Sequence, residues 1–99
     1  MTRALRFRPE ARDQLTDVYQ WYESRQRDLG RRFLEAAEAC FTQILEHPES
    51  GAPFQRKTRR ISVHDFPYYI VYVAAPDAIV VVAAIHEHSG PRRVVQLLP

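Results

Sequence analysis

The spacing of the apolar residues changes once along this 99-residue chain, and the change decides which folds it can adopt. Between residues 10 and 45, apolar side chains recur every three or four positions, as on one face of a helix. From residue 60 they alternate or run on continuously over short stretches, as in strands. A loop with Pro48, Gly51 and Pro53 separates the two regions. The pattern predicts an α+β protein with a helical part and a sheet part.

Two helices are expected in the first region. The first covers residues 10–26, and Pro9 suits its opening turn. The second follows Asp28, which we expect to cap it, and ends near Pro48. Only a few residues connect them, so they should form an antiparallel hairpin packed on one surface.

Four strands are expected, at residues 3–8, 60–64, 66–73 and 79–85. With the helices they give the order β-α-α-β-β-β in one domain, residues 1–99. The helical hairpin can cover only one face of the sheet, which makes a two-layer structure.

The two central strands are apolar on both faces. Strict alternation would place Val80, Val82 and Ala84 on one face of the last strand and the intervening residues on the other. An antiparallel sheet with one wet face would show polar residues at alternate positions. Either the C-terminal tail folds back over the second face or another chain covers it.

The net charge of +2 is unevenly distributed. Residues 1–50 carry eight Arg and nine acids, whereas residues 51–99 carry six Arg or Lys and three acids. Four of those cations fall within five positions, at Arg56, Lys57, Arg59 and Arg60, and the tail adds Arg92 and Arg93.

Several function classes are not expected. No apolar run approaches the ~18 residues of a membrane span, and the charged N-terminus does not resemble a secretory signal. We therefore expect a cytoplasmic protein with no membrane partner. The single cysteine, Cys40, falls on the apolar stripe of the second helix and is interpreted as core filler. The spacing of Cys and His fits no metal site, so neither metal nor cofactor is expected.

Several motifs occur together in a family-specific order. They are residues 7–11 with 13–15, residues 30–36, residues 45–51, and above all residues 59–72, RRISVHDFPYYIVY. A histidine, His86, then ends the last strand. These motifs resemble the ParE/RelE toxin superfamily over nearly the whole chain.

The resemblance implies a helical hairpin against a mostly antiparallel four-stranded sheet, with the first strand beside the last. It also implies the toxin of a type II toxin–antitoxin module, of the plasmid-stabilization kind, neutralised by a cognate antitoxin that wraps across helices and sheet. The residues expected to bind the antitoxin are Trp21, Tyr22, Tyr69 and Val71.

Two mechanisms occur in this superfamily. ParE-like members are not nucleases and trap DNA gyrase, which requires a binding surface; the target-binding candidates are Arg56, Lys57, Arg60, Arg92 and Arg93. RelE-like members cut mRNA in the ribosome, which requires a general base, a general acid and an arginine at the phosphate. If the chain were such an endoribonuclease, its catalytic residues would be Arg59, Arg60, His86 and His88.

The long helices, the FPYYIVY strand and the lack of an arginine directly after the last strand favour the gyrase inhibitor over the nuclease. Histidine as a residue type has an unperturbed pKa of ~6.5, which suits acid–base work, but a histidine at a strand end is more often structural. A third hypothesis is a toxin-derived domain that has lost toxicity and serves only as a binding module.

Overall fold

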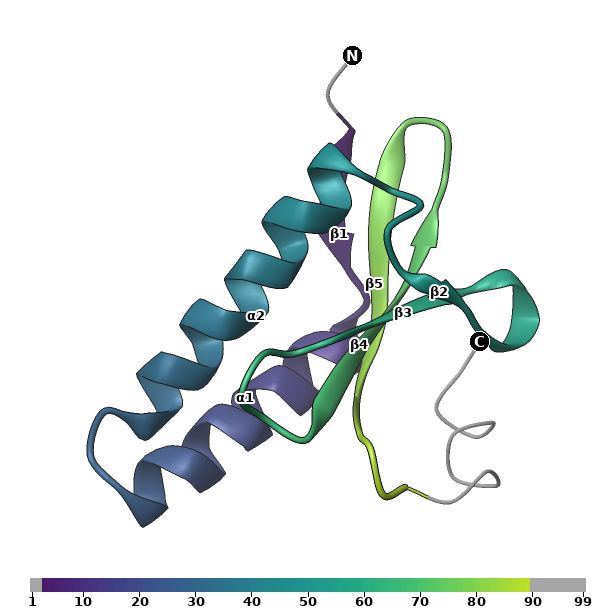
Figure 1. The fold of residues 1–99 in the computed structure, drawn as a ribbon. Helices are drawn as coiled ribbons and strands as arrows, with labels where there is room; N and C mark the ends of the chain where they lie inside the picture. Colours follow the sequence, from purple (N-terminus) through teal and green to yellow (C-terminus); the bar gives the residue numbers. More distant parts are fainter. Residues whose placement is uncertain (1–2, 90–99) are drawn as a thin grey trace.

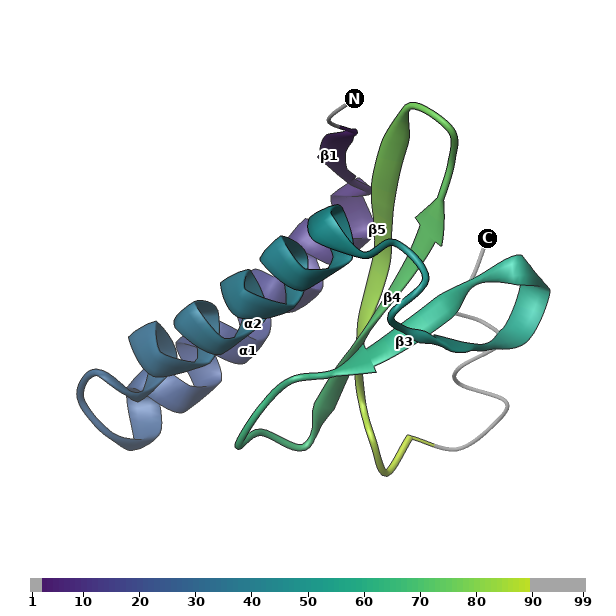
Figure 2. The same cartoon turned by 45° about the horizontal axis from the view of Figure 1, so that its top comes forward.

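The computed structural model describes residues 3–89. The first and last strands are neighbours in the sheet, because β1 (Ala4–Phe7) pairs in parallel with β5 (Ala78–His86). Between them come α1 (Pro9–Arg25), α2 (Leu29–Glu46), β2 (Ala52–Pro53), a 3-10 turn (Gln55–Lys57), β3 (Arg59–Ser62) and β4 (Tyr68–Ala74). The sheet order is β1-β5-β4-β3-β2, and both helices cover one face (Figures 1 and 2).

The predicted two-layer α+β fold, with the first strand beside the last, is confirmed. The predicted number of four strands is wrong, because β2 pairs antiparallel with the start of β3 and makes a fifth. β2 has only two residues, one of them a proline, so it is too short to show an alternating pattern.

The turn between the helices is held by a side chain from α1. The carboxylate of Glu23 accepts hydrogen bonds from the backbone amides of Asp28 and Gly30, both at 3.0 Å. Asp28 itself has a left-handed backbone (φ 68°), and its side chain makes no capping bond, so the expected Asp28 cap is wrong. The N-terminus of α2 is therefore satisfied by the preceding helix.

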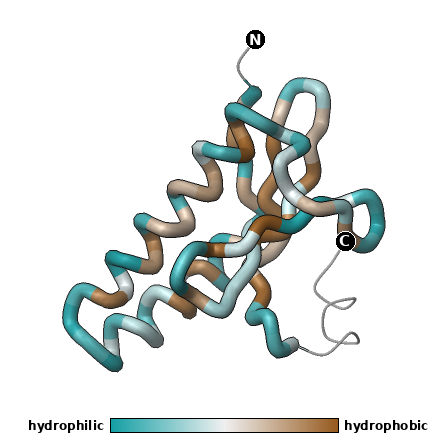
Figure 3. The backbone as a smooth tube through the Cα atoms, in the orientation of Figure 1, coloured by the Kyte–Doolittle hydropathy of each residue, from teal (hydrophilic) through white to brown (hydrophobic). Residues whose placement is uncertain are grey.

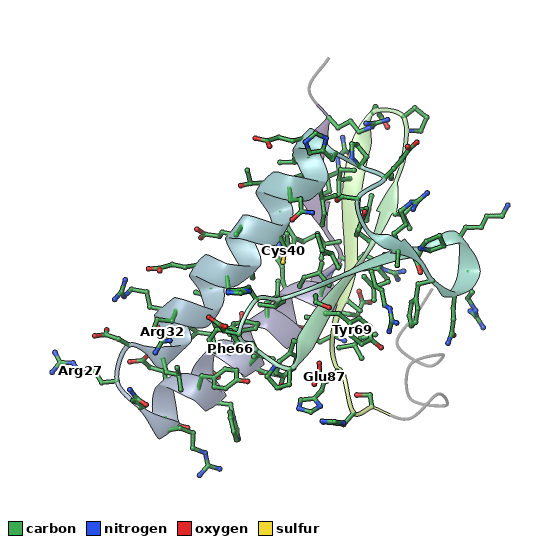
Figure 4. All side chains as sticks on the ribbon, viewed as in Figure 1. Arg27, Arg32, Cys40, Phe66, Tyr69 and Glu87 are labelled. Carbon is green, nitrogen blue, oxygen red and sulfur yellow. The ribbon has the colours of Figure 1, made fainter. Side chains whose placement is uncertain are left out.

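The main core lies between the helices and one face of the sheet. Figure 3 shows hydrophobic residues concentrated along the central strands, whereas the turn between the helices is hydrophilic. The largest fully buried side chains of this core are Phe33 and Ile44 from α2, and Ile70, Tyr72 and Ile79 from the sheet. Cys40 is buried among them, as expected, and Figure 4 shows it directed from α2 toward the sheet.

A β-bulge in β5 sets which side chains face the helices. Val71 of β4 pairs with Ala83, but the next residue, Tyr72, pairs with Val81, so Val82 is an extra residue in β5. Because of the bulge, Ala84 shares the helix-facing core with Ile79 and Val81. The strict alternation expected for this strand is therefore wrong beyond Val82.

The opposite face carries a second apolar cluster, as the doubly apolar strands predict. It consists of Tyr69, Val71, Val82, Ala83 and Ile85, with Phe54 and Val73 packed against it. The idea that the C-terminal tail covers this face concerns residues 90–99, which lie outside the described part of the chain.

Candidate functional site

A groove with a volume of about 450 Å³ opens between α1 and the ends of β4 and β5. We call it the α1 groove. Its walls are mainly apolar and aromatic, and the residues that line it are Asp17, Val18, Trp21, Tyr22, Pro67, Tyr68 and His86.

Trp21 makes this groove unusual for a monomer surface. Its side chain is 51% exposed, and it is the one large apolar residue so exposed in the described part of the chain. Its ring packs edge-on against Tyr22 at 5.1 Å between centroids, and the Arg25 guanidinium lies 4.8 Å from it. An exposed, oriented indole of this kind is typical of protein-binding surfaces.

An aromatic cluster supports the groove from below. Tyr22 contacts Phe33, Phe66 and Tyr68, with ring centroids between 5.0 and 6.3 Å apart. Burial raises the pKa of Tyr22, with a further rise from Tyr68 nearby, and burial also raises the pKa of Tyr68. Both phenols therefore stay neutral at physiological pH and offer hydrogen bonds to a partner without carrying charge.

His86 closes one end of the groove. Its ring stands edge-on to Tyr68 at 5.0 Å, and its Nδ1 accepts a hydrogen bond from the backbone amide of His88 at 3.1 Å. This bond places the ring proton of neutral His86 on Nε2. The two histidine rings thus contact each other, and His88 also lies beside Glu87.

The free edge of β5 borders the same groove. β1 pairs with β5 only as far as Val81, so α1 rather than a strand flanks residues 82–86. Here the Gln14 side-chain oxygen accepts a hydrogen bond from the Ala84 backbone amide at 2.9 Å. The Gln14 side chain thus takes the place of a neighbouring strand and makes this edge of β5 less available for pairing with another strand.

The predicted basic run forms a second exposed feature, which we call the basic hairpin (residues 52–62, the β2–β3 hairpin). Arg56 and Lys57 at its tip both have left-handed backbones (φ 53° and 61°) and exposed side chains. Such non-glycine residues cost roughly 1 kcal/mol or more each. Thr58 offsets part of this cost, since its buried hydroxyl donates to the Gln55 carbonyl at 2.5 Å.

Arg59 and Arg60 point to opposite faces of the sheet. The Arg59 guanidinium donates to the backbone carbonyls of Gly51, at 2.8 Å, and Glu49, at 3.4 Å. The exposed Arg60 guanidinium lies on the second face, 5.2 Å from the Phe54 ring and 5.1 Å from the Tyr69 ring.

Of the residues of the nuclease hypothesis, His86 and His88 lie together, but the arginines lie apart from them, since Arg59 pairs with Tyr72 and donates to the Gly51 carbonyl. His86 contacts Tyr68 on the helix-facing side, whereas Arg60 stacks on Tyr69 on the other. A base or acid and a phosphate-binding arginine must reach the same atoms. This arrangement opposes the nuclease hypothesis.

The four residues expected to bind an antitoxin also divide between the faces. Trp21 and Tyr22 line the α1 groove, but Tyr69 and Val71 belong to the second apolar cluster. The target-binding candidates Arg56, Lys57 and Arg60 share the basic hairpin, while Arg92 and Arg93 lie outside the described residues. Residues 3–89 contain no group of three metal-ligating side chains, and none of their helices is long and apolar enough to cross a membrane.

Four of the groove residues carry no specific signal in the sequence. Asp17, Val18, Pro67 and Tyr68 follow ordinary helix, turn and strand patterns, and they form a groove only because β4 and β5 end beside α1. The sequence does single out Trp21, which lies off the main helical stripe, together with Tyr22 and His86.

Comparisons with known proteins agree with this architecture. Residues 5–90 match the family described as "ParE toxin of type II toxin-antitoxin system, parDE". Toxin ParE2 of Mycobacterium tuberculosis, in both strain CDC 1551 / Oshkosh and strain H37Rv, is 28% identical over 95 residues, which cover 95% of this chain and 90% of the relative.

A solved structure described as "Chromosomal ParDE TA system from P. aeruginosa" shares the fold. The TM-score is 0.64 at 14% identity, and the match covers 86% of this chain and 96% of the other. The family match spans most of the chain and the fold agrees with it. The protein therefore belongs to the ParE toxin family of type II toxin–antitoxin systems.

Proposed function

We propose that this toxin inhibits DNA gyrase and that a cognate antitoxin silences it by docking in the α1 groove. Membership of the ParE family supports both parts of the proposal. The observation that carries the antitoxin part is the exposed Trp21 on the wall of an apolar groove. A partner that fills the groove would bury the indole beside Tyr22 and Tyr68.

The divided candidate residues suggest how far the antitoxin extends. Trp21 and Tyr22 lie on the helical side, whereas Tyr69 and Val71 lie on the other face. A segment that reaches both pairs has to pass around the sheet, which fits an extended chain better than a compact domain. We assign the first contact to the α1 groove.

Two observations favour gyrase as the target over mRNA. Arg60 and His86 lie on opposite faces of the sheet, and the Arg59 guanidinium is bound to the Gly51 carbonyl, an arrangement that disfavours a nuclease site. The basic hairpin instead offers an exposed cationic surface for a large partner.

A supercoiling assay tests the target. The purified toxin should inhibit supercoiling of relaxed plasmid by gyrase, and the cognate antitoxin added beforehand should restore it. In cells, induction of the toxin should reduce DNA synthesis before protein synthesis. An early fall in protein synthesis with gyrase unaffected would point to the ribosome as the target. If neither DNA synthesis nor protein synthesis falls, the protein would instead be a non-toxic binding module.

The antitoxin site has its own test, since Trp21 is the single tryptophan and reports on the groove. Antitoxin binding should shift its fluorescence to shorter wavelength. Trp21→Ala should weaken binding at least about tenfold, measured by calorimetry. Arg31→Ala, at an exposed position on α2, is the control and should change the affinity little. Unchanged affinity of Trp21→Ala would place docking elsewhere.

A further inference from the structure

The basic hairpin has a charge pattern unlike the rest of the described chain. Between Glu49 and Asp65 the sequence contains four Arg or Lys residues and no carboxylate. On the helices, by contrast, acidic residues are interspersed among the arginines, as Arg31 and Glu35 are on α2. A surface of one sign attracts a polyanion.

We propose that the basic hairpin binds the phosphate backbone of duplex DNA. This inference deepens the proposed action on gyrase, whose substrate is DNA, and rests on it for its biological setting. The binding itself is a property of this chain and is measurable without gyrase.

The hairpin is built to present its cations in a fixed arrangement. β2 and β3 pair through Ala52 with Arg60 and Pro53 with Arg59, and Figure 2 shows the hairpin projecting on the side away from the helices. The Phe54 amide donates to the Thr58 carbonyl at 2.8 Å, which closes the tip. A tip already ordered loses less conformational entropy when a partner binds.

Arg60 is oriented by two aromatic rings. Its guanidinium lies 5.2 Å from Phe54 and 5.1 Å from Tyr69, and the side chain remains exposed. Stacking restricts the plane of the guanidinium while its N–H groups extend along the edge. A guanidinium held in this way suits bidentate contact with a phosphate.

Two properties favour DNA over other anionic partners. Four cations within five positions and no carboxylate between Glu49 and Asp65 match the closely spaced phosphates of a nucleic acid. The width of a two-stranded ribbon fits the major groove of B-form DNA, about 12 Å across, whereas the major groove of A-form RNA is too narrow for side chains to enter.

The test measures binding of the full-length toxin to a fluorescein-labelled 20-base-pair duplex by anisotropy over a series of salt concentrations. We compare Lys57→Gln/Arg60→Gln with Arg27→Gln/Arg32→Gln, which removes the same charge. Both control residues are exposed, and Figure 4 shows them at the far end of the helical hairpin. Circular dichroism confirms that each variant is folded.

The unaltered toxin should bind the duplex with an affinity that falls as salt rises. The hairpin variant should bind roughly tenfold more weakly near 0.1 M salt, and its slope of log affinity against log salt should be smaller by about 2, because each lost phosphate contact contributes ~0.9. The control should keep the slope of the unaltered toxin. Lys57→Arg, which keeps the charge, should bind like the unaltered toxin, whereas Arg60→Lys should bind more weakly, because an ammonium group cannot contact a phosphate in bidentate fashion.

Equal losses in the hairpin and control variants would reveal only a net-charge effect and overturn the proposal. Stronger binding to duplex RNA of the same sequence, or a hairpin effect on poly-glutamate but not on DNA, would also overturn it. A toxin that inhibits gyrase yet fails to bind DNA through the hairpin refutes this inference alone. A toxin that binds DNA in this way but leaves gyrase active refutes the proposed function instead.

Discussion

The phenol oxygen of Tyr72 is joined to the backbone of Gly51. It accepts a hydrogen bond from the Gly51 amide at 2.9 Å and donates one to the Pro48 carbonyl at 2.8 Å. Tyr72 is fully buried in β4, so its hydroxyl fixes the loop that leaves α2 and enters the sheet. A Cβ on Gly51 would lie only 2.6 Å from this oxygen, so the close contact requires a glycine.

Tyr72→Phe should lower the free energy of unfolding by about 1–3 kcal/mol, because it leaves a buried amide and a carbonyl without their partner. Urea denaturation measures the change. Tyr19→Phe, which removes the hydroxyl of a half-buried tyrosine on α1, is the control and should cost less than about 0.5 kcal/mol. Equal costs would show that the Tyr72 hydroxyl has no special role.

Gly30→Ala should destabilise the helical hairpin by about 1–3 kcal/mol, since the helices approach closely at this point. The added Cβ would lie 2.6 Å from the Tyr19 carbonyl oxygen and 2.8 Å from its ring. The nearest atom belongs to the backbone, so adding Tyr19→Ala should fail to restore stability. Thermal unfolding checks both variants, and recovery in the double variant would assign the clash to the ring instead.

Glu23→Ala should cost about 0.5–2 kcal/mol, because two amides at the start of α2 lose their acceptor. Asp28→Gly should have the opposite sign and raise stability by up to about 1 kcal/mol, since glycine adopts the left-handed backbone without strain. Urea denaturation of the two variants measures both effects. A loss of stability in Asp28→Gly would show that the Asp28 side chain does cap the helix.

Cys40 should be chemically inert in the folded protein. Burial raises the pKa of its thiol above the ordinary value of 9.0, and its Sγ donates to the Ser62 carbonyl at 3.4 Å. Labelling by a thiol reagent should therefore be slow until urea unfolds the chain. Fast labelling of the native protein would contradict this burial.

The same shift in pKa gives stability a pH dependence. The folded protein keeps the Cys40 proton at a pH where the unfolded chain has lost it, so the free energy of unfolding should fall as pH rises above about 9. Tyr22 and Tyr68 act in the same direction at higher pH, since burial raises the pKa of both. Cys40→Ala should reduce the fall near pH 9 relative to the unaltered toxin.

Much of the fold could be predicted from the sequence, because periodic apolar residues report which face of an element is buried. Both helices follow this rule, and the expected bounds of α1, residues 10–26, differ from Pro9–Arg25 by one residue at each end. β2 and the cap of α2 do not follow it. β2 depends on pairing with β3, and the cap comes from Glu23 in a different helix.

The candidate site was less predictable, because a groove depends on where elements end relative to one another. Trp21 stands out in the sequence as an aromatic residue off the apolar stripe, and it does line the groove. The sequence suggests His86 as a catalytic residue only because the histidine side chain suits proton transfer. Its actual surroundings depend on the register of β5, which alternating apolar residues cannot reveal when both faces are apolar.

The bulge also makes β5 tolerant of a change in length. Val82 is one extra residue in the strand, and the pairs on either side of it, Tyr72 with Val81 and Val71 with Ala83, are already in register. Deletion of Val82 would close the ladder into a regular antiparallel pair and would leave Ala84 and His86 on the helix-facing side. Loss of this single codon would therefore change the local twist of the strand and not the face on which its last residues lie, so the bend of the sheet can vary in this lineage while the groove keeps its lining.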